Sequence, residues 1–439
     1  MKDFEILKQL EHEAKEKGSI RNKVKVAKHK VRLGFATAGL RDILLATELL
    51  PEGERDRTEG FDAALEGALG GRDFRGLDQA PVLTNFAEAL RVYARDVQLS
   101  RAQDRLLPKT IERSVDYFGK ALELLKPEQQ ESRAWVLAHR AAARMMQYWL
   151  GLAASPSAGG DDNIFVACEQ GFVEACTLFE KAKKKPYIWA VQFRAFLYAL
   201  RGRGNDFDVA LGLLTGLPAE VLARPTIQRS IAMLASYNAA PHPPESRTRE
   251  QREAAAGASI AAAMDAQRAD QDEFLASYSG AVSSWALLDM LPPPPGKNAQ
   301  GEQQPDPHAD ERLQRLRNAE TAVETADIRA RNAVSQALVA LTGLTFVRAK
   351  LAIARGANPR GPEVAALSEE SGVLQDLIEG SEFRDIESRA MVIRDPVWQA
   401  ILRDGDCRDQ FARPGFDQLR TFSRSENAVK KAKSRYQAL

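Results

Sequence analysis

The apolar residues of this 439-residue chain recur at spacings of three and four along most of its length. Over residues 81–97, for example, the apolar positions include Leu83, Phe86, Leu90, Tyr93 and Val97. Residues spaced in this way share one face of an α-helix, so each such stretch predicts an amphipathic helix with one buried face. Sustained alternation of apolar and polar residues, which half-buried β-strands require, is missing, and β-branched residues are sparse. The pattern therefore predicts an all-α protein.

Three later stretches extend this pattern. Residues 111–125 and 135–152 each carry an apolar stripe, the first with Thr110 as its expected N-cap. The segment Tyr187–Leu200 is apolar on nearly every side. Because it is too short to span a membrane, we expect a central helix that is buried between neighbouring helices.

A short pattern also recurs three times along the chain. It consists of a small residue, a bulky residue four positions later, usually an alanine three positions further on, and then a proline. The copies are Ser114, Phe118, Ala121 and Pro127; Ala175, Phe179, Ala182 and Pro186; and, more loosely, Ala210, Leu214 and Pro218. A recurring packed unit is typical of stacked helical arrays rather than of a single closed core.

These copies resemble the second helix of the tetratricopeptide repeat (TPR) family. The helices before them, which contain Trp135 and Trp189 near their starts, are similar to the first helix of that repeat. The resemblance covers about residues 108–220. It implies a superhelix of antiparallel helix pairs with a concave surface that binds peptides or partner proteins.

The chain departs from the family in spacing and in one residue type. Phe118 and Phe179 are 61 residues apart, whereas the usual repeat has about 34 residues. The glycine usual in the first helix is replaced by His139 and Phe193. We therefore expect a TPR-like α-solenoid whose repeats are elongated and irregular.

Prolines and polar runs divide the chain into three predicted regions. Residues 1–238 form the N-terminal helical array, which ends at the Pro-rich run 238–245. Residues 239–310 form a long helix or a helical hairpin between Pro-rich linkers, and residues 292–310 are expected to be disordered. Residues 311–439 form a C-terminal helical region that closes with an irregular helical cap.

The net charge of +1 excludes any global attraction to nucleic acid or membrane, but the two ends are basic. Residues 1–35 and 408–439 each carry a net charge of +5. The chain has three cysteines, too few for a disulfide framework, and its charged N-terminus lacks an apolar signal core. These features predict a cytoplasmic protein, and its Ala- and Arg-rich composition indicates a bacterial one.

The sequence offers no recognisable catalytic constellation. None of its five histidines is paired with another His or Cys at metal-ligand spacing, and no phosphate-binding glycine motif is present. We interpret His139 as a core histidine, and Cys168 and Cys176 as buried small hydrophobic residues. The sequence therefore predicts a non-enzymatic protein without catalytic, cofactor-binding or metal-binding residues. An enzyme of unrecognised type within 360–439 remains a minor alternative.

The main functional hypothesis is a scaffold, adaptor or sensor subunit of a bacterial signalling or defence complex. Its protein or peptide partner, such as a catalytic subunit of the same complex, would bind the inner helix faces near Arg140, Arg144 and Arg194. The alternative is a nucleic-acid-associated regulator that uses the basic ends. Its candidate residues in the N-terminal segment are Arg21, Lys23, Lys25, Lys28, Lys30 and Arg32. The simpler interpretation of that segment is a surface helix whose valines dock on the array.

Overall fold

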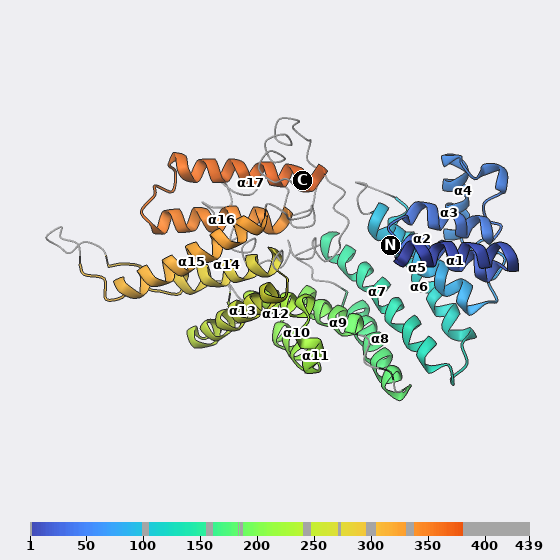
Figure 1. The fold of residues 1–439 in the computed structure, drawn as a ribbon, viewed down its shortest axis with the longest axis horizontal. Coiled ribbons are helices and arrows are strands. Elements are labelled where there is room, and N and C mark those ends of the chain that lie inside the picture. The colour runs from blue at the N-terminus through green and yellow to red at the C-terminus, as the bar shows by residue number, and fades with distance from the viewer. Residues whose placement is uncertain are drawn as a thin grey trace. The chain divides into compact units, whose positions relative to one another are not determined.

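The computed structural model describes most of the chain up to residue 380 (Figure 1). The described residues are 2–98, 105–154, 161–182, 184, 188–239, 247–270, 274–295, 304–330 and 338–380. Within these ranges every regular element is a helix and no strand occurs, which confirms the all-α prediction. The expected C-terminal cap, Cys407 and the basic tail 408–439 lie outside the described residues.

The chain divides into two compact units, and the division falls at Leu197–Tyr198 rather than near residue 238. The helices of the first unit are α1 (Lys2–Lys17), α2 (Ile20–Arg32), α3 (Ala36–Ala46), α4 (Thr58–Leu69), α5 (Ala80–Tyr93), α6 (Leu107–Leu124), α7 (Gln130–Ala154), α8 (Asp162–Lys181) and most of α9 (Ile188–Arg201). A 3₁₀ helix, η1 (Glu52–Glu54), and a π-helical turn, η2 (Ala94–Gln98), complete it.

Helix α5 is the enclosed helix of the first unit. It packs against α2, α3 and α6, and every residue from Phe86 to Tyr93 is buried. Sequence reasoning assigned this role to Tyr187–Leu200. In α9, however, burial is confined to positions such as Ala190, Ala195 and Leu197, and the other residues there are largely half-buried. Among the described elements, no helix packs on α9 as extensively as α2, α3 and α6 pack on α5.

The repeated small and bulky residues lie at the seams between helices. Ser114 is fully buried, and its hydroxyl donates a hydrogen bond of 2.7 Å to the Ala87 carbonyl oxygen. Phe118 on α6 and Phe179 on α8 are both buried against α7, which lies between these two helices. Thr110 is not the N-cap of α6, because that helix already begins at Leu107 and Thr110 donates back to the Leu106 carbonyl.

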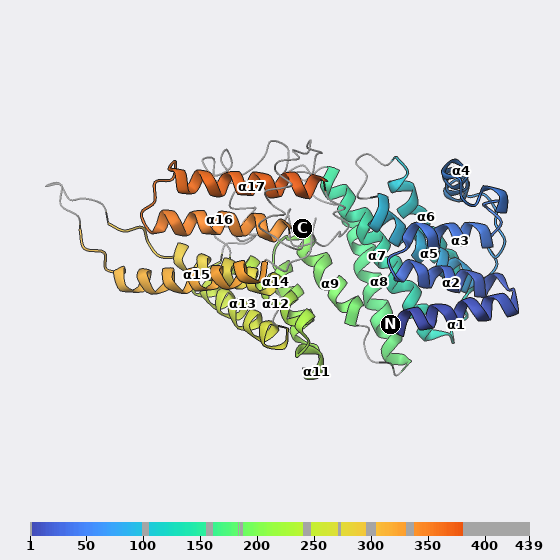
Figure 2. The same ribbon diagram turned by 45° about the horizontal axis from the view of Figure 1, so that its top comes forward.

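The second unit consists of successive helix pairs. Its helices are α10 (Asp206–Thr215), α11 (Ala219–Leu222), α12 (Pro225–Ala239), α13 (Arg249–Ala269), α14 (Phe274–Asp289), α15 (Ala309–Ala330), α16 (Leu338–Ala354) and α17 (Pro362–Gly380). Helices α12 and α13, α14 and α15, and α16 and α17 pack as pairs, and α16 and α17 lie side by side in both ribbon views (Figure 2). In addition, α14 packs against both α12 and α16, so alternate helices stack on one another.

Helix α14 is enclosed in the same way as α5, since every residue from Ala276 to Ala286 is buried. Its Tyr278 lies directly against Gly343 of α16, where a Cβ atom would fall 2.9 Å from the Tyr278 Cζ atom. Helices α13 and α14 form a helical hairpin, one of the two arrangements expected for this region. The predicted disorder of residues 292–310 is wrong for residues 304–310, because Asp306 and His308 are held in a polar network described below.

Close helix contact at Gly39 generates a first prediction. A Cβ atom at this position would lie 2.6 Å from the Ala27 carbonyl oxygen of α2 and would also clash with the Val31 side chain. Because backbone cannot move aside cheaply, Gly39→Ala should lower the free energy of unfolding by about 1–3 kcal/mol, measured by urea denaturation. Gly151→Ala is the matched control, because Gly151 is exposed on α7 and a Cβ atom there would have no neighbour within 4 Å. This substitution should leave the free energy of unfolding unchanged or raise it slightly. Equal stabilities of the two variants would contradict the packing of α3 on α2.

Candidate functional site

Six rings from helices α6 to α9 gather in the first unit, and we call them the aromatic cluster. Its members are Phe118, Trp135, His139, Phe179, Trp189 and Phe193. Trp135 and His139 are one turn apart on α7 and therefore share a face, and Trp189 and Phe193 are related in the same way on α9. The cluster thus joins α7 and α9, the two helices whose tryptophans resemble each other in sequence position.

His139 lies at the centre of this cluster and is 5% exposed. Its ring stacks on Trp135 with the ring centroids 5.4 Å apart, and it lies 6.1 Å from Phe118 and 5.1 Å from Trp189. The sequence interpretation of His139 as a core histidine agrees with this position. Contact with three rings fixes the imidazole plane, so His139 acts as an aromatic packing residue here.

Three rings at the edge of the cluster are only half-buried: Trp135, Trp189 and Phe193. Trp189 and Phe193 are in close contact, with their centroids 4.1 Å apart. Tryptophan presents a large rigid surface at little entropic cost, which is why it is enriched among the residues that dominate protein interfaces. The half-buried edge therefore leaves part of three aromatic side chains accessible.

Charged residues of α2 and α5 flank the cluster, and sequence reasoning missed them. The Arg91 guanidinium lies 5.7 Å from the Trp189 ring centroid, within range of a cation–π contact. Glu88, one turn earlier on α5, is buried and forms an ion pair of 2.7 Å with Lys28 of α2. The available signal was the position of Glu88 and Arg91 inside an otherwise apolar helix, where charges are retained only if they find partners.

The three arginines predicted to bind a partner do not share one environment. The Arg194 guanidinium donates from Nε (3.1 Å) and Nη2 (2.5 Å) to the Glu169 carboxylate on α8, so its charge is balanced within the unit. Arg140 and Arg144 of α7 form no ion pair with any carboxylate in the described part of the chain. Helical geometry also turns both away from His139, by about 100° or more around the α7 axis.

The basic residues from Arg21 to Arg32 all lie in α2. Some of them are paired with carboxylates of neighbouring helices, and others are exposed. Val24, Val26 and Val31 are buried, as expected for a surface helix that docks through its valines. Lys28 is paired with Glu88. The Lys30 ammonium lies 2.8 Å from the Asp42 carboxylate on α3, and although burial opposes it, hydrogen bonding and charge from Asp42 raise the pKa of Lys30.

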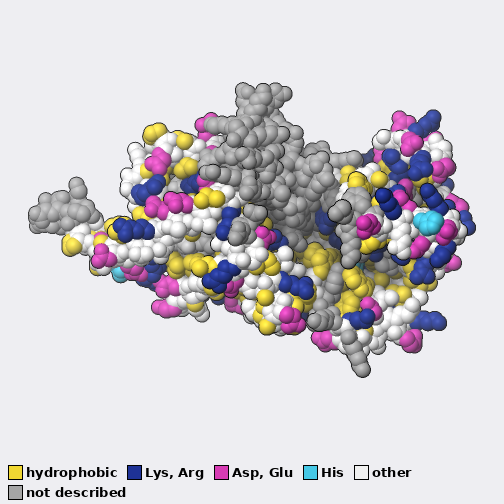
Figure 3. Space-filling view, viewed as in Figure 1, with side chains coloured by type: hydrophobic (Ala, Val, Ile, Leu, Met, Phe, Trp, Pro, Cys, Tyr) yellow, Lys and Arg dark blue, Asp and Glu magenta, His cyan; other side chains and the backbone are white. Residues whose placement is uncertain are grey.

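The exposed cations of α2 are Arg21, Lys23 and Lys25. The side chain of Arg32 is not among those that the structure describes. Arg21 and Lys25 share a face, while Lys23 projects from another side of the helix. In the view of Figure 3, Lys and Arg side chains are interspersed with Asp and Glu rather than gathered in one patch. Because the exposed cations of α2 project from different sides of the helix, they do not form a continuous basic strip.

The cysteines of α8 lack the properties of reactive thiols. Burial raises the pKa of the Cys168 thiol to about 12 and also raises that of Cys176, despite the opposing charges of Arg144 and Arg194. Both thiols are therefore protonated near neutral pH. The described residues contain no group of three or more His, Cys, Asp or Glu side chains arranged to hold a metal ion. None of the described helices combines the length and apolar character needed to cross a membrane.

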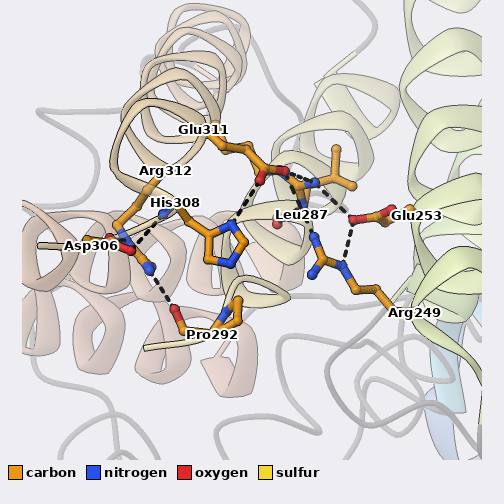
Figure 4. A network of polar contacts seen from close by, with 9 residues as sticks. Arg249, Glu253, Leu287, Pro292, Asp306, His308, Glu311 and Arg312 are labelled. Carbon is orange, nitrogen blue, oxygen red and sulfur yellow. Dashed lines mark hydrogen bonds and ion pairs between the residues drawn. The ribbon is translucent and has the colours of Figure 1, made fainter. Parts of the chain in front are cut away.

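A polar network in the second unit joins α13, the end of α14 and the start of α15 (Figure 4). Arg315 donates to the Glu253 carboxylate at 2.9 Å and to the Leu287 carbonyl oxygen, and it also pairs with Glu311. Arg249 donates to Glu253 at 3.0 Å. The Arg315 hydrogen bond is the main reason that the pKa of Glu253 is lowered.

The same network fixes the residues that lead into α15. Arg312 donates to the Asp306 carboxylate and to the Pro292 carbonyl oxygen, so it ties together the two ends of the connection between α14 and α15. The Arg312 hydrogen bond lowers the pKa of Asp306. Because these carboxylates are paired with arginines of the chain itself, the network is best explained as a structural clamp.

The comparisons with known proteins returned no match. No protein-family model matches this sequence, and no curated protein or solved structure is significantly similar to it.

The clamp generates a prediction about pH. The pKa of Glu253 is lowered on folding, so its ionised form contributes stability above about pH 4.5, and this contribution is lost as the pH falls through the folded-state pKa. Glu253→Gln should reduce the free energy of unfolding at pH 7 by about 1 kcal/mol. This is the contribution of a hydrogen bond to a charged group, lowered because the pair is partly exposed to solvent. At pH 3 the variant and the parent should differ much less. Glu324→Gln, an exposed change on α15, is the control and should have no effect at either pH. A loss that does not depend on pH would rule out the ionised clamp.

Proposed function

We propose that this chain is a non-enzymatic scaffold, an adaptor or sensor subunit that binds a peptide or partner protein at the half-buried edge of the aromatic cluster. The observation that carries the proposal is the presence of Trp135, Trp189 and Phe193 together at that edge, with Arg91 against Trp189. Aromatic and arginine side chains are the residue types most enriched among interface hot spots. A rigid helical frame behind them lowers the entropic cost of binding.

The proposed architecture is a TPR-like α-solenoid with irregular repeats. Support comes from the second unit, where three helix pairs follow one another and the alternate helices α12, α14 and α16 stack in order. In the first unit, Phe118 and Phe179 occupy the two seams on either side of α7. Stacked pairs of this kind present extended surfaces, which suits the binding of a peptide or of a helix.

A binding role also agrees with the environments of the described thiols and carboxylates, the groups that could take part in catalysis. The thiols of Cys168 and Cys176 have raised pKa values, and carboxylates such as Glu169, Glu253 and Asp306 are held by arginines. Groups with these partners stabilise the fold. We place the scaffold in a bacterium on its Ala- and Arg-rich composition and in the cytoplasm on its few cysteines, and we propose that it works within a signalling or defence complex.

The scaffold proposal predicts that capture of a partner depends on Trp189. Tagged protein would be incubated with a lysate of the native source at 0.15 M and 0.5 M salt, and the proteins that co-elute would be quantified by mass spectrometry. Trp189→Ala should reduce capture of the partner at least tenfold, because a central aromatic anchor contributes about 2 kcal/mol or more to binding. Val173→Ala is the matched control, an exposed apolar residue of α8 outside the cluster, and should retain capture. Circular dichroism would verify that both variants fold.

Salt separates this proposal from nucleic-acid binding through α2. Three phosphate contacts by Arg21, Lys23 and Lys25 would weaken binding about tenfold or more between the two salt concentrations. An aromatic anchor should be much less sensitive to salt. If capture survives Trp189→Ala but is lost at 0.5 M salt or after Arg21, Lys23 and Lys25 are replaced by alanine, the nucleic-acid-associated alternative would replace the scaffold.

A further inference from the structure

We infer that Arg140 and Arg144 form a carboxylate-binding site that receives an acidic side chain of the protein partner. The inference rests on the proposed scaffold function and names the chemistry that its partner must present. The two residues are four positions apart on α7, so their side chains emerge one turn apart from the same face of the helix. Both are half-buried.

The position of Arg140 depends on a glycine of the neighbouring helix. A Cβ atom at Gly119 of α6 would lie 3.2 Å from Arg140 Nη2, 3.4 Å from Cζ and 3.8 Å from Nε. These similar distances show that one face of the planar guanidinium lies over the bare backbone at Gly119. The Nε atom is buried without an acceptor, so the remaining Nη groups are the part of Arg140 that can meet a ligand. The guanidinium therefore packs on α6 at Gly119.

Neither guanidinium is neutralised by the described residues around it. Arg144 makes one long hydrogen bond, 3.4 Å from Nη1 to the Ala167 carbonyl oxygen of α8. Burial and then the charge of Arg144 lower the pKa of Arg140, while the charges of Asp116 and Glu123 on α6 oppose this effect. Asp116 lies 3.5 Å from Arg113, which holds it on its own helix.

Arg194 provides the internal comparison. It occupies the same position relative to Trp189 as Arg140 does relative to Trp135, five residues further along the helix. Arg194 is bound by Glu169 through two hydrogen bonds, whereas Arg140 has no corresponding carboxylate. Two adjacent, half-buried and unneutralised cations repel each other, and an incoming carboxylate relieves that repulsion while accepting charge-assisted hydrogen bonds. A dianionic phosphate is disfavoured relative to a carboxylate, since its second negative charge adds to the repulsion from Asp116 and Glu123.

The site can be tested with a defined probe. A fluorescein-labelled hexaglutamate peptide would be titrated with the full-length protein at constant ionic strength, with labelled hexaglutamine as the neutral comparison. We expect the parent protein to bind hexaglutamate at least tenfold more tightly than hexaglutamine. The double variant Arg140→Gln/Arg144→Gln should lose at least tenfold in affinity and melt at the same temperature as the parent or higher, because the repulsion is removed. Glu123→Gln should tighten binding, because a competing carboxylate is removed.

The control variant Lys126→Gln/Lys181→Gln removes two exposed positive charges from the same unit and should bind within twofold of the parent. An equal loss in this control, or no loss in the arginine variant, would overturn the site. Inorganic phosphate that competes at lower concentration than free hexaglutamate would overturn the assignment to carboxylate. Trp189→Ala should leave hexaglutamate binding unchanged, so failure of the scaffold proposal in the capture experiment can be distinguished from failure of this site.

Discussion

An amphipathic helix cannot bury its apolar face alone, and this constraint governs both units of the chain. Each helix must approach a neighbour closely enough to exclude water, and small residues permit that approach. Gly39 brings α3 onto the backbone of α2, Gly171 of α8 lies against Ala141 of α7, and Gly343 of α16 lies against Tyr278 of α14. Close packing at such points turns a series of marginal helices into continuous cores.

The same constraint produces one enclosed helix in each unit, α5 in the first and α14 in the second. The enclosed helices fix the positions of the pairs that pack on them, and in the first unit α5 also places Arg91 against Trp189. The aromatic cluster is therefore linked to α5 through Arg91.

The sequence was sufficient to predict helices, because apolar spacing is a local property. It predicted the burial of Phe118 and Phe179 and the docked valines of α2, but it left a long helix and a hairpin as alternatives for α13 and α14. Pairings between distant residues were not predictable. The partner of Lys28 is Glu88, sixty positions away, and nothing near Arg140 or Arg194 in the sequence shows that Glu169 neutralises only the latter. The enclosed helix was misassigned to α9 because an apolar composition does not reveal how many neighbours a helix has.

Both units depend most directly on the enclosure of α5 and α14, which native-state hydrogen–deuterium exchange of the whole chain measures. Amides of residues 86–93 and 276–286 should exchange at least a hundredfold more slowly than those of the more exposed helices α1 and α15 in the same molecule, because they open only when their unit unfolds. Comparable exchange rates in these four helices would contradict the enclosed-helix architecture and every inference drawn from it.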